Sequence, residues 1–122
     1  MNSEGKLARI LVVEDVAILA LALAQTLEAA GFEVLGPAPS AAKALALIAG
    51  GLCDGAVLDI NLRGETSEPV ATELISRGTT FIALTGYSPG QRPSIFANIP
   101  TLTKPVRAAD LIAAVRGFLA GT

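Results

Sequence analysis

Ala56-Val57-Leu58-Asp59 is the stretch that decides the fold, because it is apolar up to its last residue and then ends on a carboxylate. A short, continuous apolar run of this kind predicts a strand that is buried on both faces, as in a parallel sheet. We therefore expect residues 56–59 to form the third and central strand of such a sheet. Residues 61–65 are expected to follow as a loop.

Both flanks of this strand repeat the alternation of an apolar run with a helical pattern. Glycine and proline separate the segments, as they do at the ends of helices and strands. Three prolines between residues 88 and 100 leave room for only a short or irregular helix near residues 94–98. The alternation predicts an α/β fold in one domain over residues 1–122, a parallel sheet with helices on both faces. Further strands are expected at 9–13, 32–35, 80–84 and 102–103, and further helices at 16–30, 40–49, 69–76 and 108–119.

Composition excludes several classes of function. Nine basic and 11 acidic residues give a net charge of −2, which is too balanced for nucleic-acid binding. The chain has no histidine and one cysteine, Cys53, so zinc sites, disulfides and Ser-His catalysis are not expected, and Cys53 is expected to pack in the core. Residues 1–8 lack the apolar core of a signal peptide, and the longest apolar stretch, 16–24, is far short of the roughly 20 residues that a membrane span needs. We expect a cytoplasmic protein.

Polar residues stand where the predicted strands end: Glu14 and Asp15 after the first, Asp59 at the third, Thr85 at the fourth and Lys104 at the fifth. In sheets of this type the ligand site lies at the carboxyl ends of the strands. Carboxylates gathered there repel one another, by on the order of 4 kcal/mol for one pair at about 4 Å and an effective dielectric constant of 20. Oxygen ligands without histidine or cysteine favour a hard divalent cation such as Mg²⁺.

A metal beside an aspartate, a lysine and a threonine is suited to phosphoryl transfer, which depends mainly on positioning and charge neutralisation. Asp59 is the expected nucleophile, with Glu14 and Asp15 holding the metal. Lys104 would pair with Asp59 or an incoming phosphoryl oxygen, and Thr85 would hydrogen-bond the phosphoryl group. Each residue alone is commonplace, since an aspartate after a strand is more often a cap or turn residue. The interpretation depends on their conjunction.

The same residues give the chain a resemblance to the response-regulator receiver family, the CheY-like superfamily, over about residues 7–119. The resemblance lies in an acidic pair, a phosphoacceptor strand, a switch hydroxyl and a lysine followed by a proline that is often cis. These motifs are Val12-Val13-Glu14-Asp15, Val57-Leu58-Asp59-Ile60-Asn61-Leu62, Leu84-Thr85-Gly86 and Leu102-Thr103-Lys104-Pro105.

Family membership would imply a flavodoxin-like sheet of order 2-1-3-4-5. It would also imply that Asp15 and Asp59 bind Mg²⁺ or Mn²⁺ directly, that Glu14 does so mainly through water, and that the main-chain carbonyl of Asn61 completes the protein ligands. The chain departs from the family at Thr101, where receivers usually place a tyrosine or phenylalanine that swings inward on phosphorylation. Tyr87 is the candidate substitute for this switch residue.

The run Phe81-Ile82-Ala83-Leu84-Thr85-Gly86-Tyr87 is similar to a subgroup named for its Phe-Ala-Thr-Gly-Tyr motif. That resemblance implies a stand-alone receiver with a shortened fourth helix, and a kinase of the HWE type in an alphaproteobacterium. It leaves open whether the domain forms a homodimer.

The first predicted helix carries two sets of apolar residues. Ile18 and Leu21 fall opposite the stripe that should face the core. Exposed apolar residues are normal, but in this family the corresponding face meets the phosphorylated histidine helix of the partner, so Ile18, Leu21 and Pro105 are candidate docking residues. The expected core stripe is Val16, Leu19, Ala20, Leu23 and Leu27.

The sequence therefore predicts a response regulator that accepts a phosphoryl group on Asp59 from a histidine kinase or a histidine phosphotransfer protein. With no room for an output domain in 122 residues, it would signal or relay by protein contact. It would not be an enzyme beyond Mg²⁺-dependent self-phosphorylation and autodephosphorylation. Alternatives are a phosphate sink, a receiver that no longer accepts phosphate, and a haloacid-dehalogenase-like phosphatase. The last needs an acid/base aspartate two residues after the nucleophile, where this chain has Asn61.

Overall fold

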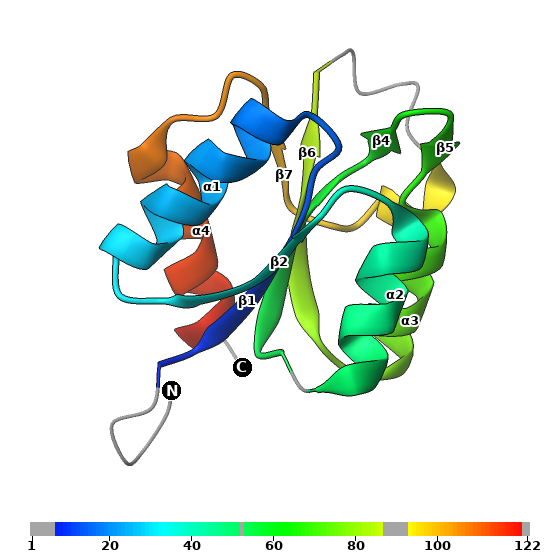
Figure 1. Cartoon of the computed structure of the whole chain (residues 1–122), viewed down its shortest axis with the longest axis horizontal. Coiled ribbons are helices and arrows are strands. Elements are labelled where there is room, and N and C mark those ends of the chain that lie inside the picture. The colour runs from blue at the N-terminus through cyan, green and yellow to red at the C-terminus, as the bar shows by residue number, and fades with distance from the viewer. Residues whose placement is uncertain (1–6, 52, 87–92, 121–122) are drawn as a thin grey trace.

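The computed structural model describes residues 7–51, 53–86 and 93–120. Five parallel strands form one sheet in the order β2-β1-β3-β6-β7. Because β4 and β5 pair separately, β6 and β7 are the fourth and fifth strands of this sheet, and the predicted order 2-1-3-4-5 is confirmed. Helices α1 and α4 cover one face of the sheet, and α2 and α3 cover the other (Figure 1). The elements are β1 (Arg9–Val13), α1 (Ala17–Ala29), β2 (Glu33–Ala38), α2 (Ala41–Gly50), β3 (Gly55–Asp59), β4 (Asn61–Leu62), β5 (Glu65–Thr66), α3 (Glu68–Ser76), β6 (Thr80–Thr85), the 3₁₀ helix η2 (Ser94–Phe96), β7 (Thr101–Thr103) and α4 (Ala108–Ala120).

Strand β3 lies at the centre of the sheet, between β1 and β6, and all five of its residues are buried. Its side chains alternate between two apolar cores. Ala56 and Leu58 pack under α2 and α3, whereas Val57 packs under α1 and α4. Burial on both faces explains why the run is continuously apolar. Asp59 is the exception, and it lies where the strand leaves the core.

Helix boundaries agree closely with the sequence pattern. Ser40 is the N-cap of α2, with its hydroxyl accepting a hydrogen bond from the Lys43 N–H at 3.1 Å. Gly31 follows α1 with a φ of 98°, a left-handed conformation that favours glycine. The predicted irregular segment contains one short 3₁₀ helix, η2, in its described part. No helix within the described ranges combines the length and the hydropathy that a membrane span requires.

Three expectations were wrong. Strand β2 does not end before Gly36 and Pro37 but continues to Ala38, with a register shift opposite β1. An edge strand has a neighbouring strand on one side only, so it tolerates a proline, which has no N–H to donate on the open side. The predicted loop at 61–65 forms a β4–β5 hairpin. Val16 and Leu19 of the expected core stripe are 37% and 42% exposed, because Val16 precedes the helix and Leu19 lines a groove.

Candidate functional site

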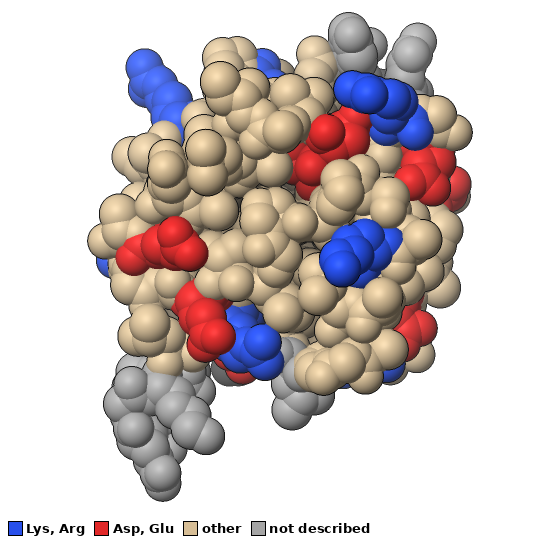
Figure 2. Space-filling view, viewed as in Figure 1, with Lys and Arg blue, Asp and Glu red and all other residues tan. Residues whose placement is uncertain are grey.

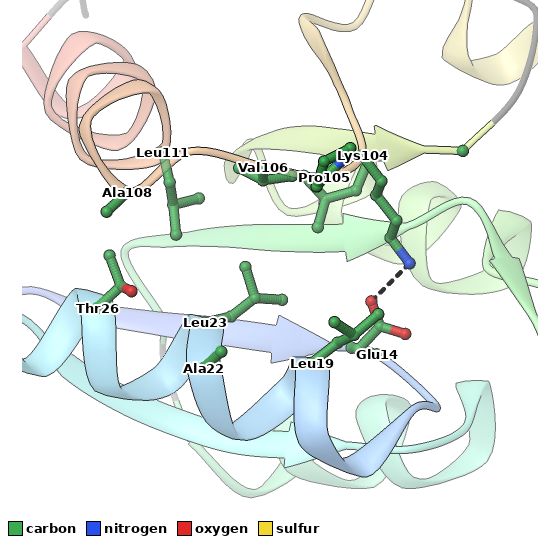
Figure 3. A pocket seen from close by; sticks show the side chains of 12 residues that line it. Glu14, Leu19, Ala22, Leu23, Thr26, Lys104, Pro105, Val106, Ala108 and Leu111 are labelled. Atoms are coloured by element: carbon green, nitrogen blue, oxygen red, sulfur yellow. Dashed lines mark ion pairs between the residues drawn. The ribbon is translucent and has the colours of Figure 1, made fainter.

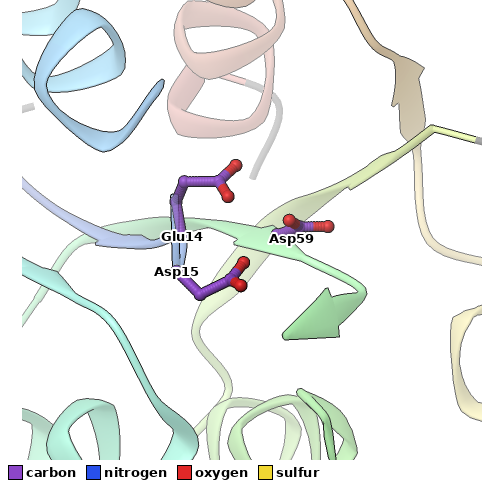
Figure 4. A group of neighbouring side chains, drawn as sticks. All are labelled: Glu14, Asp15 and Asp59. Carbon is purple, nitrogen blue, oxygen red and sulfur yellow. The ribbon is translucent and has the colours of Figure 1, made fainter. Parts of the chain in front are cut away.

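Three carboxylates converge at the carboxyl edge of the sheet, as expected from the strand order. Glu14 and Asp15 directly follow β1, and Asp59 is the last residue of the neighbouring β3. One oxygen from each carboxylate lies within 4.8 Å of those of the other two (Figure 4). Glu14 and Asp59 are buried, and Asp15 is partly exposed. The cluster is thus open to solvent mainly on the side of Asp15.

Lys104 brings a positive charge to this cluster from the end of β7. Its Nζ lies 2.7 Å from Asp59 Oδ2 and 2.8 Å from Glu14 Oε1. The backbone fixes its position, because the Lys104 N–H donates to the Thr85 carbonyl at 2.8 Å. The Lys104–Pro105 peptide bond is cis, as the family resemblance led us to expect. One ammonium therefore bridges the expected nucleophile and one of the expected metal ligands.

Burial governs the ionisation of both partners. Loss of water around its carboxylate raises the pKa of Glu14, and the hydrogen bonds from Lys104 and from the Val16 N–H only partly offset this. For Lys104, burial alone would lower the pKa, but the bonds to Asp59 and Glu14 outweigh it, so the pKa of Lys104 is raised. Lys104 is consequently a stable cation at neutral pH.

The structure places Asn61 and Thr85 at the same edge, whereas Thr101 lies at the amino end of β7. Asn61 begins β4 and is exposed, and its N–H donates to Asp59 Oδ1 at 3.3 Å. Thr85 is buried at the end of β6, one residue beyond the Leu84 that pairs with Asp59. Thr101 begins β7, and its hydroxyl donates to the Ile99 carbonyl at 3.0 Å. The predicted switch residue Tyr87 lies outside the described residues, so its role stays a prediction.

These donors fit a hard divalent cation, because all are oxygens and their negative charge exceeds what Lys104 neutralises. The two oxygens of Glu14 are already engaged, one by Lys104 and one by the Val16 N–H. The expected role of Glu14 through water stays a prediction. Asp15 is the carboxylate best placed for direct coordination, since its ion pair with Arg63 is loose, at 4.0 Å.

Arg63 was missed by the sequence analysis. It lies in the turn of the β4–β5 hairpin, with its Nε 4.0 Å from Asp15 Oδ2. No sequence pattern signals it, because a single arginine in an expected loop is ordinary. Arg63 comes to lie beside Asp15 because the hairpin folds back toward the carboxyl ends of the strands.

A groove of about 380 Å³, also not foreseen, adjoins the cluster between α1 and the start of α4 (Figure 3). Leu23 of α1 and Leu111 of α4 face each other across it. Most of its lining is apolar, and the ion pair of Glu14 and Lys104 closes one end. The groove therefore leads directly to the acidic cluster.

Apolar surface continues from this groove over α1. Ile18 is 74% exposed and Leu21 is 55% exposed, as predicted, and Pro105 is exposed at the edge of the groove. The surface over α1 is largely free of charged side chains (Figure 2). The outer face of a surface helix normally carries polar and charged residues, and this face of α1 is more apolar than that.

Comparisons with known proteins decide the family. No family model matches the sequence, and no curated protein does. Among solved structures, a response regulator receiver protein from Sinorhizobium medicae WSM419 is 30% identical, with a TM-score of 0.79, over 93% of this chain and 95% of that chain. The chain belongs to the response regulator receiver family.

Two further structures agree with this assignment. SdrG from Sphingomonas melonis Fr1 is 37% identical, with a TM-score of 0.81, over 93% of this chain and 98% of that chain. A CheY-like receiver domain from Methanospirillum hungatei JF-1 is 27% identical, with a TM-score of 0.85, over 95% and 96%. SdrG has also been solved in a BeF₃-activated conformation. The CheY-like fold is thus common to this chain and these relatives.

Proposed function

We propose that this receiver accepts a phosphoryl group on Asp59 from the phosphohistidine of a kinase or of a phosphotransfer protein. The observation that carries the proposal is the contact of Lys104 with both Asp59 and Glu14, at 2.7 and 2.8 Å, inside a cluster of three carboxylates. A purely structural salt bridge would not need two further carboxylates beside it, because their repulsion costs stability. The BeF₃-activated form of SdrG supports the proposal.

In the proposed step an Asp59 carboxylate oxygen attacks phosphorus, the P–N bond to the histidine breaks, and the released imidazole takes up a proton. Lys104 would hold Asp59 in place and then neutralise a phosphoryl oxygen. The Thr85 hydroxyl would donate to another phosphoryl oxygen. A divalent cation held by Asp15, Asp59 and the Asn61 carbonyl, with Glu14 acting through water, would supply further neutralisation of charge.

Replacement of the nucleophile tests this proposal. Asp59→Asn should abolish acid-labile labelling by acetyl phosphate in the presence of Mg²⁺, whereas the wild-type chain should be labelled. Asp54→Asn is a matched control, because Asp54 lies at the opposite edge of the sheet, where its Oδ2 accepts the Arg9 N–H at 2.7 Å. Labelling of Asp59→Asn at the wild-type level would refute the assignment.

For the partner, we propose that a helix carrying the phosphohistidine docks on α1 through Ile18 and Leu21, with Pro105 at the edge of the contact. The exposed apolar surface there adjoins the acidic cluster, so a helix lying on it would present its histidine to Asp59. Ile18→Lys should slow transfer from a kinase by about tenfold or more and leave labelling by acetyl phosphate unchanged. Ile75→Lys is the control, since Ile75 is 50% exposed on α3, on the other face of the sheet. Equal effects of Ile18→Lys on both donors would contradict the docking assignment.

We also propose membership of the Phe-Ala-Thr-Gly-Tyr subgroup, with a kinase of the HWE type as donor. The short η2 helix and the sequence run from Phe81 to Tyr87 support this. Phosphotransfer profiling against a panel of kinases tests it, and a preference for kinases of another type would refute it.

A final part of the proposal is that the protein turns over no external substrate. Sustained hydrolysis of a small phosphate ester such as p-nitrophenyl phosphate would contradict this.

A further inference from the structure

Arg63 is held over the acidic cluster by a short, anchored hairpin. Leu62 pairs with Glu65 across the turn, in which Gly64 adopts a φ of 74°. Two contacts fix the hairpin: Glu65 Oε2 accepts the Ala41 N–H at the start of α2 at 3.1 Å, and the Ser67 N–H donates to the Ile60 carbonyl at 2.9 Å. Basic and acidic side chains adjoin over this hairpin (Figure 2). The position of Arg63 near the cluster is therefore built into the backbone.

The charges of the cluster give this position a consequence. Lys104 is shared between Glu14 and Asp59, so its single positive charge does not balance the three carboxylates. Arg63 lies on the remaining side, where its Nε is 4.0 Å from Asp15 Oδ2. Each of the three carboxylates thus has a cationic side chain beside it: Lys104 serves Glu14 and Asp59, and Arg63 serves Asp15.

The Arg63 ion pair is weak, which makes it displaceable. Its distance is at the outer limit for an ion pair, and the Arg63 side chain is 85% exposed. A pair of this kind contributes little to stability, because solvent screens it and both side chains lose freedom. A divalent cation that binds Asp15 would displace the guanidinium but would remain close to its positive charge. Like charges at such short range lower the affinity for the cation.

We propose that Arg63 is a displaceable counter-ion of Asp15 that competes with the divalent cation and so weakens its binding. This inference depends on the metal site of the proposed function. Arg63 would set the concentration of divalent cation at which the receiver can be phosphorylated on Asp59. The number and sign of charges around oxygen ligands are known to tune cation affinity.

Titration with Mg²⁺ tests this inference without any phosphoryl donor. The dissociation constant would be measured from the amide NMR signals of the cluster residues in the full chain. Arg63→Ala should lower it by about three- to tenfold, and Arg63→Lys should leave it within about twofold of wild type. Arg77→Ala is the matched control, because it removes the same charge from the end of α3, where Arg77 pairs with Glu73. It should have no effect.

Ionic strength provides a second readout. Raising it from about 0.05 M to about 1 M should shrink the difference between wild type and Arg63→Ala, because salt screens exposed charges. An unchanged dissociation constant in Arg63→Ala, or the same change in Arg77→Ala, would overturn the inference while leaving the metal site intact. Absence of Mg²⁺ binding to the wild-type chain, or binding unaffected by Asp15→Asn, would overturn the metal site as well. The two failures are therefore distinguishable.

Discussion

Asp15→Asn should stabilise the protein when no divalent cation is present and abolish its response to Mg²⁺. The substitution keeps the shape of the side chain and removes one of three clustered negative charges. Two like charges about 4.8 Å apart repel by roughly 3.5 kcal/mol at an effective dielectric constant of about 20, and by roughly 0.9 kcal/mol in bulk water. Asp15 is repelled by both Glu14 and Asp59, and its side chain is 15% exposed.

Loss of attraction to Lys104 and Arg63 offsets part of this gain. The pair with Arg63 is worth less than about 1 kcal/mol at its distance and exposure. We expect a net stabilisation of about 1 to 2 kcal/mol. For a chain of this size, each kcal/mol raises the Tm by roughly 3 to 6 °C. Wild type should gain roughly 1.4 kcal/mol at a free Mg²⁺ concentration of about ten times its Kd, and Asp15→Asn should gain almost nothing.

Urea denaturation followed by circular dichroism, first with EDTA and then with Mg²⁺, measures both effects. Glu28→Gln is the control, because it removes one negative charge from the exposed last turn of α1, remote from the cluster. Lower stability of Asp15→Asn than of wild type in EDTA would contradict the repulsion within the cluster. Equal stabilisation of both proteins by Mg²⁺ would contradict the role of Asp15 as a metal ligand.

Three further predictions concern packing and ionisation. Gly55→Ala should cost roughly 1 to 3 kcal/mol in urea denaturation, because a methyl group at this position would overlap the ring of Phe118, and adding Phe118→Leu should restore part of the loss. Ser40→Ala should cost about 1 kcal/mol in the same assay through loss of the N-cap of α2. Burial, with a smaller contribution from Asp54, raises the pKa of the Cys53 thiol. Alkylation of Cys53 by iodoacetamide should therefore begin at higher pH than that of free cysteine, and identical pH profiles would contradict this.

Much of the fold follows from local chemistry. The continuous apolar run before Asp59 predicts a strand buried on both faces, and the alternation with helices then dictates parallel strands whose carboxyl ends share one edge. That step alone brings Glu14, Asp15 and Lys104 to Asp59. Cys53, expected to be a packing residue, lies against the core under α2 and α3.

The remaining features depend on neighbours that a local pattern does not reveal. Gly36 and Pro37 look like the end of a strand, yet β2 continues because it lies at the edge of the sheet. Leu19 has the spacing of a core residue, but it lines an open groove. Arg63 reaches Asp15 only because β4 and β5 pair, and two-residue strands leave no periodic signal.

Chemical location of the phosphoryl group tests the role of Asp59 most directly. The protein would be treated with acetyl phosphate and Mg²⁺, reduced with borohydride, which converts an aspartyl phosphate to homoserine, and digested for peptide mass spectrometry. If Asp59 is the phosphoacceptor, homoserine should appear at position 59 of the wild-type chain, and only when Mg²⁺ is present. Reduction at another carboxylate, with Asp59 intact, would show that Asp59 is not the phosphoacceptor.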